Sequence, residues 1–196
     1  MRIVIAGILG GLVMFLWGFV SHMATPLGSM GMHTLPVAQQ DAVIATSKLA
    51  FGNTPGVYMV PGLEDMNDYG DEAKMKAFGE RTKGAPYAFV VYRPDGNTAG
   101  AEMGPNLGKE LATNVVSAIV AAAIAIGLVG FGSRVIAIGM MGLFAWLAIS
   151  VPYWNWYRFP TDFTIANLVI QVVGWTLAGM AIAWWLGRNE RRRGSL

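Results

Sequence analysis

The sequence predicts a membrane all-α protein: a four-transmembrane-helix bundle with a small extracytoplasmic α/β insert between helices 1 and 2. Hydrophobic residues make up 54% of the chain and charged residues only 13%. Four apolar runs approach or exceed the ~20 residues with which a helix crosses a bilayer core. Between the first two runs lies a long segment rich in prolines, turn formers and acids, which is typical of a water-exposed domain.

The first transmembrane helix is predicted at residues 1–23. A cleaved secretory signal is the alternative, but His22 stands where the cleavage site needs a small residue, so we expect the helix to be retained. Gly7, Gly11 and Gly18 fall near one stripe of this helix, where the missing side chains let a second helix approach closely. The ordinary glycine frequency of membrane helices explains the spacing equally well.

The extracytoplasmic insert is predicted at residues 24–110. We expect it to hold a helix at 35–51, a strand at 57–60, a helix at 71–83 and a strand at 87–93. The second strand is apolar on both faces and therefore needs cover on both faces. Because a domain of this size buries only a thin core, we expect the helices or a partner to cover part of it.

Three more apolar runs complete the predicted bundle. The spans are expected at 111–131, 135–151 and 163–187, and a basic cytoplasmic tail follows at 188–196. Only three residues separate the second span from the third, so these two are predicted to be antiparallel neighbours.

One face of the fourth span is unusually polar and small. It carries Asn167, Gln171, Gly174 and Ala178 at helical spacing. Amide side chains in lipid seek hydrogen-bond partners on other helices, so this face is predicted to point into the bundle.

An aromatic extracytoplasmic loop is predicted at residues 152–162. Six aromatic residues lie between Tyr153 and Phe163, and such rings settle at the depth of the lipid headgroups. Pro152 is expected to end the third span, and Pro160 to precede the start of the fourth.

The basic residues predict the orientation. A four-span topology puts one set of arginines on a single side, against Arg158 alone in the short opposite loop, and this favours cytoplasmic termini. We therefore predict a multi-pass protein of the bacterial inner (plasma) membrane with its insert outside. The cytoplasmic arginines are Arg2, Arg134, Arg188, Arg191, Arg192 and Arg193.

The sequence block Val151-Pro152-Tyr153-Trp154-Asn155-Trp156-Tyr157-Arg158-Phe159-Pro160 resembles a block found in an uncharacterised family of bacterial four-helix inner-membrane proteins. The resemblance extends to Asp162-Phe163, Gly174-Trp175, Ala178-Gly179, Gly56-Val57-Tyr58 and Tyr92-Arg93-Pro94, and so covers most of the chain. It supports the predicted architecture and implies no activity.

Several classes of function are excluded or disfavoured. The chain has no cysteine, which excludes disulfides, thiolate metal sites and cysteine nucleophiles. A net charge of +2 gives no reason to expect nucleic acid as a partner. No phosphate-binding glycine loop is present, and no ionisable residue is predicted within the four spans, which disfavours proton relays and ion-coupled transport. We therefore predict neither an enzyme nor a bound cofactor.

The two histidines and three neighbouring methionines form the first candidate site. Imidazole and thioether groups select Cu(I) where thiolates are absent, so a copper site is chemically plausible. The alternative is that the histidine snorkels to the membrane surface while the methionines fill gaps in the packing. The residues are His22, Met23, Met30, Met32 and His33.

The aromatic loop is the second candidate site. Trp154, Trp156, Tyr157 and Arg158 can hold a lipid headgroup or a quinone-like ring, with the guanidinium on a phosphate and the indoles stacked. Plain anchoring at the membrane surface is the alternative.

A third group is acidic: Glu64, Asp65, Asp68, Asp71 and Glu72. It lacks the ligand alternation of a calcium loop, so a solvated turn at the start of a helix explains it better.

The function that these observations predict is a non-enzymatic accessory or structural subunit of a larger bacterial inner-membrane complex. Membrane lipids and other membrane-protein subunits are its expected partners. Two alternatives are a copper-handling membrane protein and a lipid- or quinone-binding accessory protein.

Overall fold

The computed structural model describes residues 1–97 and 102–193. The chain divides into two compact units, which we call the helical unit (Met1–His33 with Ala101–Leu196) and the insert unit (Thr34–Gly100). The boundary differs from the predicted one at both ends of the insert. Residues 24–33 belong to the helical unit, where a Cβ on Gly31 would lie 3.0 Å from the backbone nitrogen of Phe163.

The helical unit holds four helices that are long and apolar enough to cross a membrane, as predicted. They are α1 (Arg2–Met23), α4 (Met103–Ala125), the continuous helix that starts with α5 (Phe131–Ala145), and α7 (Thr161–Arg193). After α5 the same helix continues through a π-helical turn (Trp146–Ser150) into α6 (Val151–Tyr157).

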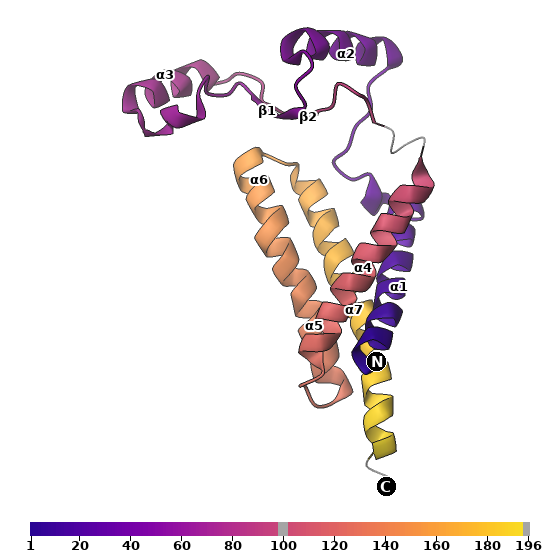
Figure 1. Ribbon diagram of the computed structural model, residues 1–196. Coiled ribbons are helices and arrows are strands. Elements are labelled where there is room, and N and C mark those ends of the chain that lie inside the picture. Colours follow the sequence, from indigo (N-terminus) through magenta and orange to yellow (C-terminus); the bar gives the residue numbers. More distant parts are fainter. Residues whose placement is uncertain (98–101, 194–196) are drawn as a thin grey trace. The chain divides into compact units, whose positions relative to one another are not determined.

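The four helices are labelled in Figure 1, and their main contacts link α4 to α1, α1 to α7 and α7 to α5. The most extensive contacts are α5 with α7, α1 with α4, and α1 with α7. The helices α4 and α5 run antiparallel, as predicted, but share only a small contact. Each of the two packs more extensively on another helix, α4 on α1 and α5 on α7.

Glycines set the contact between α1 and α4. A Cβ on Gly7 would lie 2.6 Å from the Cα of Ile119, and one on Gly11 would lie 2.5 Å from the Cα of Val115. Neither distance can be accommodated, so the two backbones touch here because the side chains are missing. The predicted close approach is confirmed at Gly7 and Gly11, whereas Gly18 has open space.

The buried core lies toward the end of the helical unit where α4 connects to α5. Small and branched apolar side chains fill it, which allows short distances between helix axes. Its fully buried members are Ala6, Ala118, Ala121, Ala122, Ala125, Ile138, Ile182 and Leu186. We call this end the turn end, and the opposite end, where α1 stops and α4 and α7 start, the rim end.

Two arginines contact helix carbonyls at the turn end. Arg134 is only 1% exposed and its Nε donates to the carbonyl of Ala125, 3.3 Å away at the end of α4. Arg2 donates through Nη2 to the carbonyl of Leu186 at 3.0 Å. Cations are favourable beside the carbonyl ends of helices, so Arg134 stabilises the end of α4, while Arg2 ties the start of α1 to α7 two turns before the end of that helix.

Several predicted boundaries are corrected by the structure. Helix α4 begins at Met103 rather than 111 and therefore contains Lys109 and Glu110, while Arg134 lies inside α5. The helices that are long enough to cross a membrane therefore carry ionisable residues, which the sequence analysis had placed outside the spans. Pro152 does not end the third helix, which runs on to Tyr157, so most of the predicted loop is helical.

The predicted basic tail is helical through Arg193, and residues 194–196 lie outside the described part of the chain.

The insert unit contains the predicted elements. They are α2 (Val37–Phe51), β1 (Gly56–Val60), a 3-10 turn (Met66–Gly70), α3 (Glu72–Thr82) and β2 (Ala88–Tyr92). The two strands pair antiparallel, with Tyr58 opposite Val90. Phe51 stacks on Tyr58 with ring centroids 4.2 Å apart, and the Tyr92 hydroxyl donates to the carbonyl of Gly52 at 2.9 Å. These contacts join the end of α2 to the sheet.

Replacing Gly11 by leucine is expected to lower the free energy of unfolding by about 1–3 kcal/mol, because the new side chain must displace the α4 backbone. Gly18→Leu is the matched control, since a Cβ at Gly18 meets no atom within 4 Å and the residue borders an open groove. Thermal unfolding of the detergent-solubilised protein measures both variants. Equal destabilisation by the two substitutions would contradict the assigned α1–α4 contact.

Candidate functional site

The chain reverses direction between α6 and α7 at a residue in a strained conformation. Arg158 follows α6 with φ 59° and ψ 33°, the left-handed region that glycine usually occupies at the end of a helix. The backbone nitrogen of Phe159 donates to the carbonyl of Tyr153 at 3.3 Å, which closes the turn. The side chain of Arg158 is exposed at this turn.

Aromatic rings line up along the turn. Tyr153 lies 5.5 Å from Tyr157 and stacks on Phe159 at 5.5 Å between centroids, and Phe159 lies 5.5 Å from Phe163. Trp154 donates through Nε1 to the hydroxyl of Thr161 at 3.0 Å. The ring contacts and this bond tie α6 to the first turn of α7.

A cavity of about 270 Å³ lies between these elements. Its walls come from the last turn of α5, the π-helical turn, α6 and the first three turns of α7. The lining side chains are aromatic or apolar with a few polar groups, as is usual for small-molecule sites. They include Trp146, Ser150, Tyr153, Phe159, Phe163, Asn167 and Gln171.

Two amide side chains supply polarity to this cavity. Asn167 donates through Nδ2 to the carbonyl of Phe163 at 2.9 Å, and Gln171 accepts through Oε1 from Nε1 of Trp175 at 3.1 Å. The predicted cross-helix amide bonds are therefore wrong, because both amides bond within α7. The carboxamide oxygen of Asn167 and the nitrogen of Gln171 are not used in these bonds and can serve a ligand.

Two other members of the predicted inward face do point into protein. Gly174 and Ala178 are both buried. A Cβ on Gly174 would lie 2.6 Å from the sulfur of Met14 in α1. Asn167 and Gln171 are half-buried.

The predicted aromatic site lies beside this cavity rather than in it. Trp154, Trp156 and Arg158 are exposed, Tyr157 is half-buried, and none of the four lines the cavity. Sequence reasoning missed Trp146, Phe159 and Phe163 as cavity residues. The four-residue spacing of Phe163, Asn167 and Gln171 was the one available signal, since it puts them on one helix face.

The five residues of the predicted copper site follow α1 into the next segment. His22 lies in the last turn of α1, and its Nδ1 is 2.9 Å from the carbonyl of Gly18. Met30 is half-buried, whereas Met23, Met32 and His33 are exposed. Only His22 and Met23 share a groove. The copper hypothesis stays a prediction.

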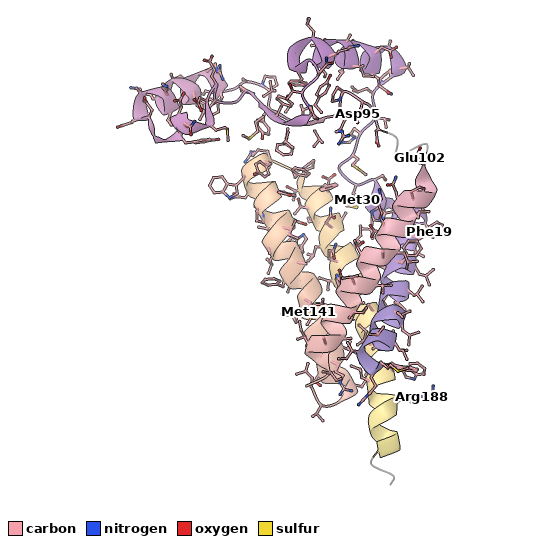
Figure 2. The ribbon with its side chains drawn as sticks, viewed as in Figure 1. Phe19, Met30, Asp95, Glu102, Met141 and Arg188 are labelled. Atoms are coloured by element: carbon pink, nitrogen blue, oxygen red, sulfur yellow. The ribbon has the colours of Figure 1, made fainter. Side chains whose placement is uncertain are left out.

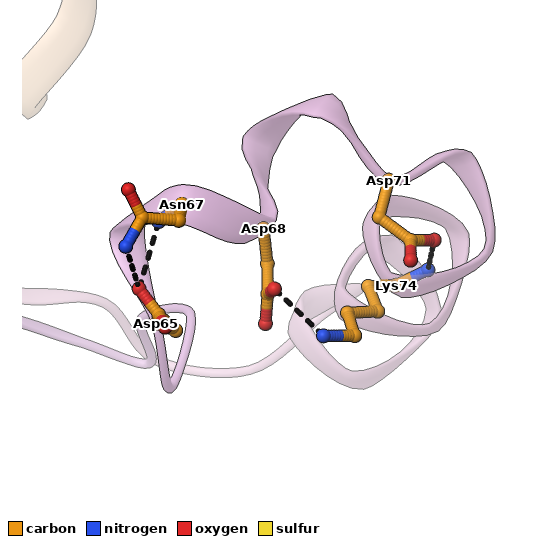
Figure 3. A network of polar contacts seen from close by, with 5 residues as sticks. All are labelled: Asp65, Asn67, Asp68, Asp71 and Lys74. Carbon is orange, nitrogen blue, oxygen red and sulfur yellow. Dashed lines mark hydrogen bonds and ion pairs between the residues drawn. The ribbon is translucent and has the colours of Figure 1, made fainter.

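The acidic group forms hydrogen bonds and an ion pair within the insert unit (Figure 3). The Asp65 carboxylate accepts from the backbone and side chain of Asn67 at 2.8 Å, and Asp71 accepts from the backbone nitrogen of Lys74 at 3.0 Å. Lys74 lies 2.7 Å from Asp68. These carboxylates thus order a turn and the start of α3, as the sequence favoured.

Within the described residues, no group of three or more histidine and acidic side chains is placed to hold a metal ion. Comparison with protein-family models, curated proteins and solved structures gives no match. The resemblance to a bacterial inner-membrane family therefore stays a prediction, and the function has to be inferred from the geometry.

Replacing Arg158 by glycine is expected to stabilise the fold by roughly 1–2 kcal/mol relative to Arg158→Ala, because glycine adopts the left-handed conformation without a Cβ clash. Both variants remove the guanidinium, so the comparison isolates backbone strain from charge. Thermal unfolding in detergent gives the difference. Equal stability of the two variants would contradict a strained turn.

Proposed function

We propose that this chain is a non-enzymatic accessory or structural subunit of a larger assembly in the bacterial inner membrane, with both termini in the cytoplasm. The observation that carries the proposal is that no residue described in the insert unit, between 34 and 97, is buried. The helical unit, in contrast, has a continuous core. A folded segment without a core of its own needs a surface to rest on.

The sheet of the insert unit presents one wholly apolar face. Val57 pairs with Val91 and Met59 with Phe89, so these four side chains share one side of the two strands. Val57 is 59% exposed and Val91 is 70% exposed. Burying this face against another protein removes that apolar surface from water, which favours association.

Helix α2 also exposes apolar side chains. None of its residues is buried, and Ile44 is 64% exposed. A groove of about 950 Å³ lies between α2 and β2, and in the described part of the chain the sheet has two strands, β1 and β2. A groove with apolar side chains such as Val43, Ile44 and Val91 beside a small sheet is an arrangement that accepts a further strand or helix.

The charged residues nearest to the end of β2, Arg93 and Asp95, follow the strand and are not part of it. Arg93 donates hydrogen bonds of 3.0 and 2.6 Å to the two oxygens of Asp95, and this lowers the pKa of the Asp95 carboxyl. Figure 2 labels Asp95 in this part of the insert unit. The strand from Ala88 to Tyr92 is left free of charge along its length, so a partner strand can pair without desolvating an ion.

The charge distribution of the helical unit supports the proposed orientation. Arg2 and Arg134 lie at the turn end, and Arg188 is labelled near that end in Figure 2. In the turn between α6 and α7, at the rim end, Arg158 is the one basic residue. Cationic residues favour the cytoplasmic side.

Hydrogen exchange tests whether the insert unit is covered. In the purified monomer, amides of α2 and β2 are expected to exchange rapidly, because little packing protects their hydrogen bonds. In native membranes, where the partner is present, the same amides are expected to become protected while those of α1 and α7 stay unchanged. Rapid exchange of α2 in both preparations would contradict the proposal.

The cavity beside the α6–α7 turn favours a second candidate function, the binding of a quinone-like ring or a lipid. It combines stacked aromatic walls with an amide acceptor and an amide donor one turn apart, which suits an uncharged ring bearing oxygen atoms. The π-helical turn in its wall is a feature often found at functional sites.

A ligand of this kind is expected to co-purify with the protein and to be lost in Gln171→Leu, which removes the donor. Thr113→Val, which replaces a polar side chain by an apolar one at an exposed position of α4, is the matched control. Ultraviolet absorbance of the organic extract measures a bound quinone. Equal quinone absorbance in the extracts of wild type and Gln171→Leu would exclude quinone binding at this site.

A further inference from the structure

A groove of about 370 Å³ opens between α1 and α4 at the rim end. Its walls are apolar, and two polar side chains, His22 and Glu110, stand among them. The remaining lining residues are Phe15, Gly18, Phe19, Met23, Met103 and Leu107. Figure 2 places Phe19 along this side of the helical unit. We propose that the groove binds a phospholipid whose headgroup carries a primary ammonium.

The groove exists because α1 and α4 stop touching. Contacts Gly7–Ile119 and Gly11–Val115 set an antiparallel register, which continues to Gly18 opposite Gly108. At both of these glycines a Cβ would meet nothing within 4 Å. The glycines would thus allow α1 and α4 to touch at the rim end as well. The structure instead leaves a groove between them, with room for an acyl chain.

The position of His22 along α1 matches the depth of a headgroup. This step rests on the proposed membrane placement of the four helices. Helix α1 has 22 residues, and at ~1.5 Å per residue it spans about 33 Å, close to the ~30 Å of a bilayer core. His22 and Glu110 therefore lie near the boundary where lipid headgroups begin.

His22 offers a hydrogen-bond acceptor at this depth. Its Nδ1 lies 2.9 Å from the carbonyl of Gly18, which can only accept, so Nδ1 carries the proton. In the neutral ring Nε2 is then the acceptor. The Ser21 hydroxyl also contacts Nδ1, at 3.2 Å, and holds the same edge of the ring.

Glu110 offers a negative charge. Its Oε1 accepts from Nδ2 of Asn114 at 3.2 Å, which orients the carboxylate and leaves the second oxygen for a ligand. A primary ammonium has N–H groups for both the Glu110 carboxylate and Nε2 of His22. A choline headgroup has no N–H, and a glycerol headgroup has no positive charge, so neither satisfies both side chains.

A transmembrane helix of a partner fits this groove less well than a lipid. A partner helix has to desolvate the Glu110 carboxylate or bring its own cation, which is costly at the membrane boundary. A lipid supplies an apolar chain for the groove and an ammonium at the required depth.

Intact-protein mass spectrometry of the full-length chain in mild detergent tests the proposal. The probes are four phospholipids with identical acyl chains: phosphatidylethanolamine, its monomethyl derivative, phosphatidylcholine and phosphatidylglycerol. Retention is expected to fall stepwise as N–H donors are lost, and Glu110→Gln is expected to reduce the preference for phosphatidylethanolamine over phosphatidylglycerol about tenfold. Glu80→Gln, on exposed α3, is the matched control.

Gly18→Leu is a second, independent test. A Cβ at Gly18 meets no atom within 4 Å, so the leucine side chain can enter the groove and should displace every phospholipid bound there. Gly132→Leu, at a glycine with equally open space near the turn end, should leave retention unchanged. Equal retention of the four lipids by wild type, or of phosphatidylethanolamine by Gly18→Leu, would mean annular lipid only and would overturn the site. Protein that never partitions into membranes would overturn the membrane placement instead.

Discussion

Close contact between helix backbones is the constraint on which the helical unit depends. Without side chains at Gly7 and Gly11, α1 reaches the backbone of α4. Gly142 allows a similar approach of α5 to α7, since a Cβ there would lie 2.6 Å from the carbonyl oxygen of Gln171. Helices in lipid gain little from hydrophobic burial, so such contacts decide which pairs form. Where the contacts stop, the helices separate, and both the aromatic cavity and the α1–α4 groove lie in those regions.

The sequence predicted the helices and strands well because each has a local signal. Asp71 and Gly84 mark the two ends of α3, and the structure has Asp71 as its capping residue and Gly84 at φ 74°. The same kind of local signal gave a wrong prediction at Pro152, which was expected to end the third helix. A proline cannot donate to the carbonyl four residues earlier. In the π-helical turn just before α6, the N–H of Val151 already donates to the carbonyl of Trp146, five residues earlier, so the helix continues.

The candidate sites were harder to predict because they depend on how helices diverge. Gly18 has the same sequence signal as Gly11, and only the residues that α4 places opposite show that one is packed and the other open. Asn167 and Gln171 were correctly singled out as a polar face. Their bonding partners were missed, because Phe163 and Trp175 on the same helix satisfy the amides before any neighbour does.

The π-helical turn at Trp146–Ser150 also sets the rotational phase of everything that follows it. One residue of an α-helix corresponds to about 100° of rotation. If residues 146–150 wound as a regular α-helix instead, α6 would turn by about that angle about its axis. Tyr153 would then leave the ring of Phe159, and the turn into α7 would start from another side. In evolution, loss of one residue from this segment should therefore go together with loss of the π-helical turn, because the two changes together leave the direction of α6 unchanged.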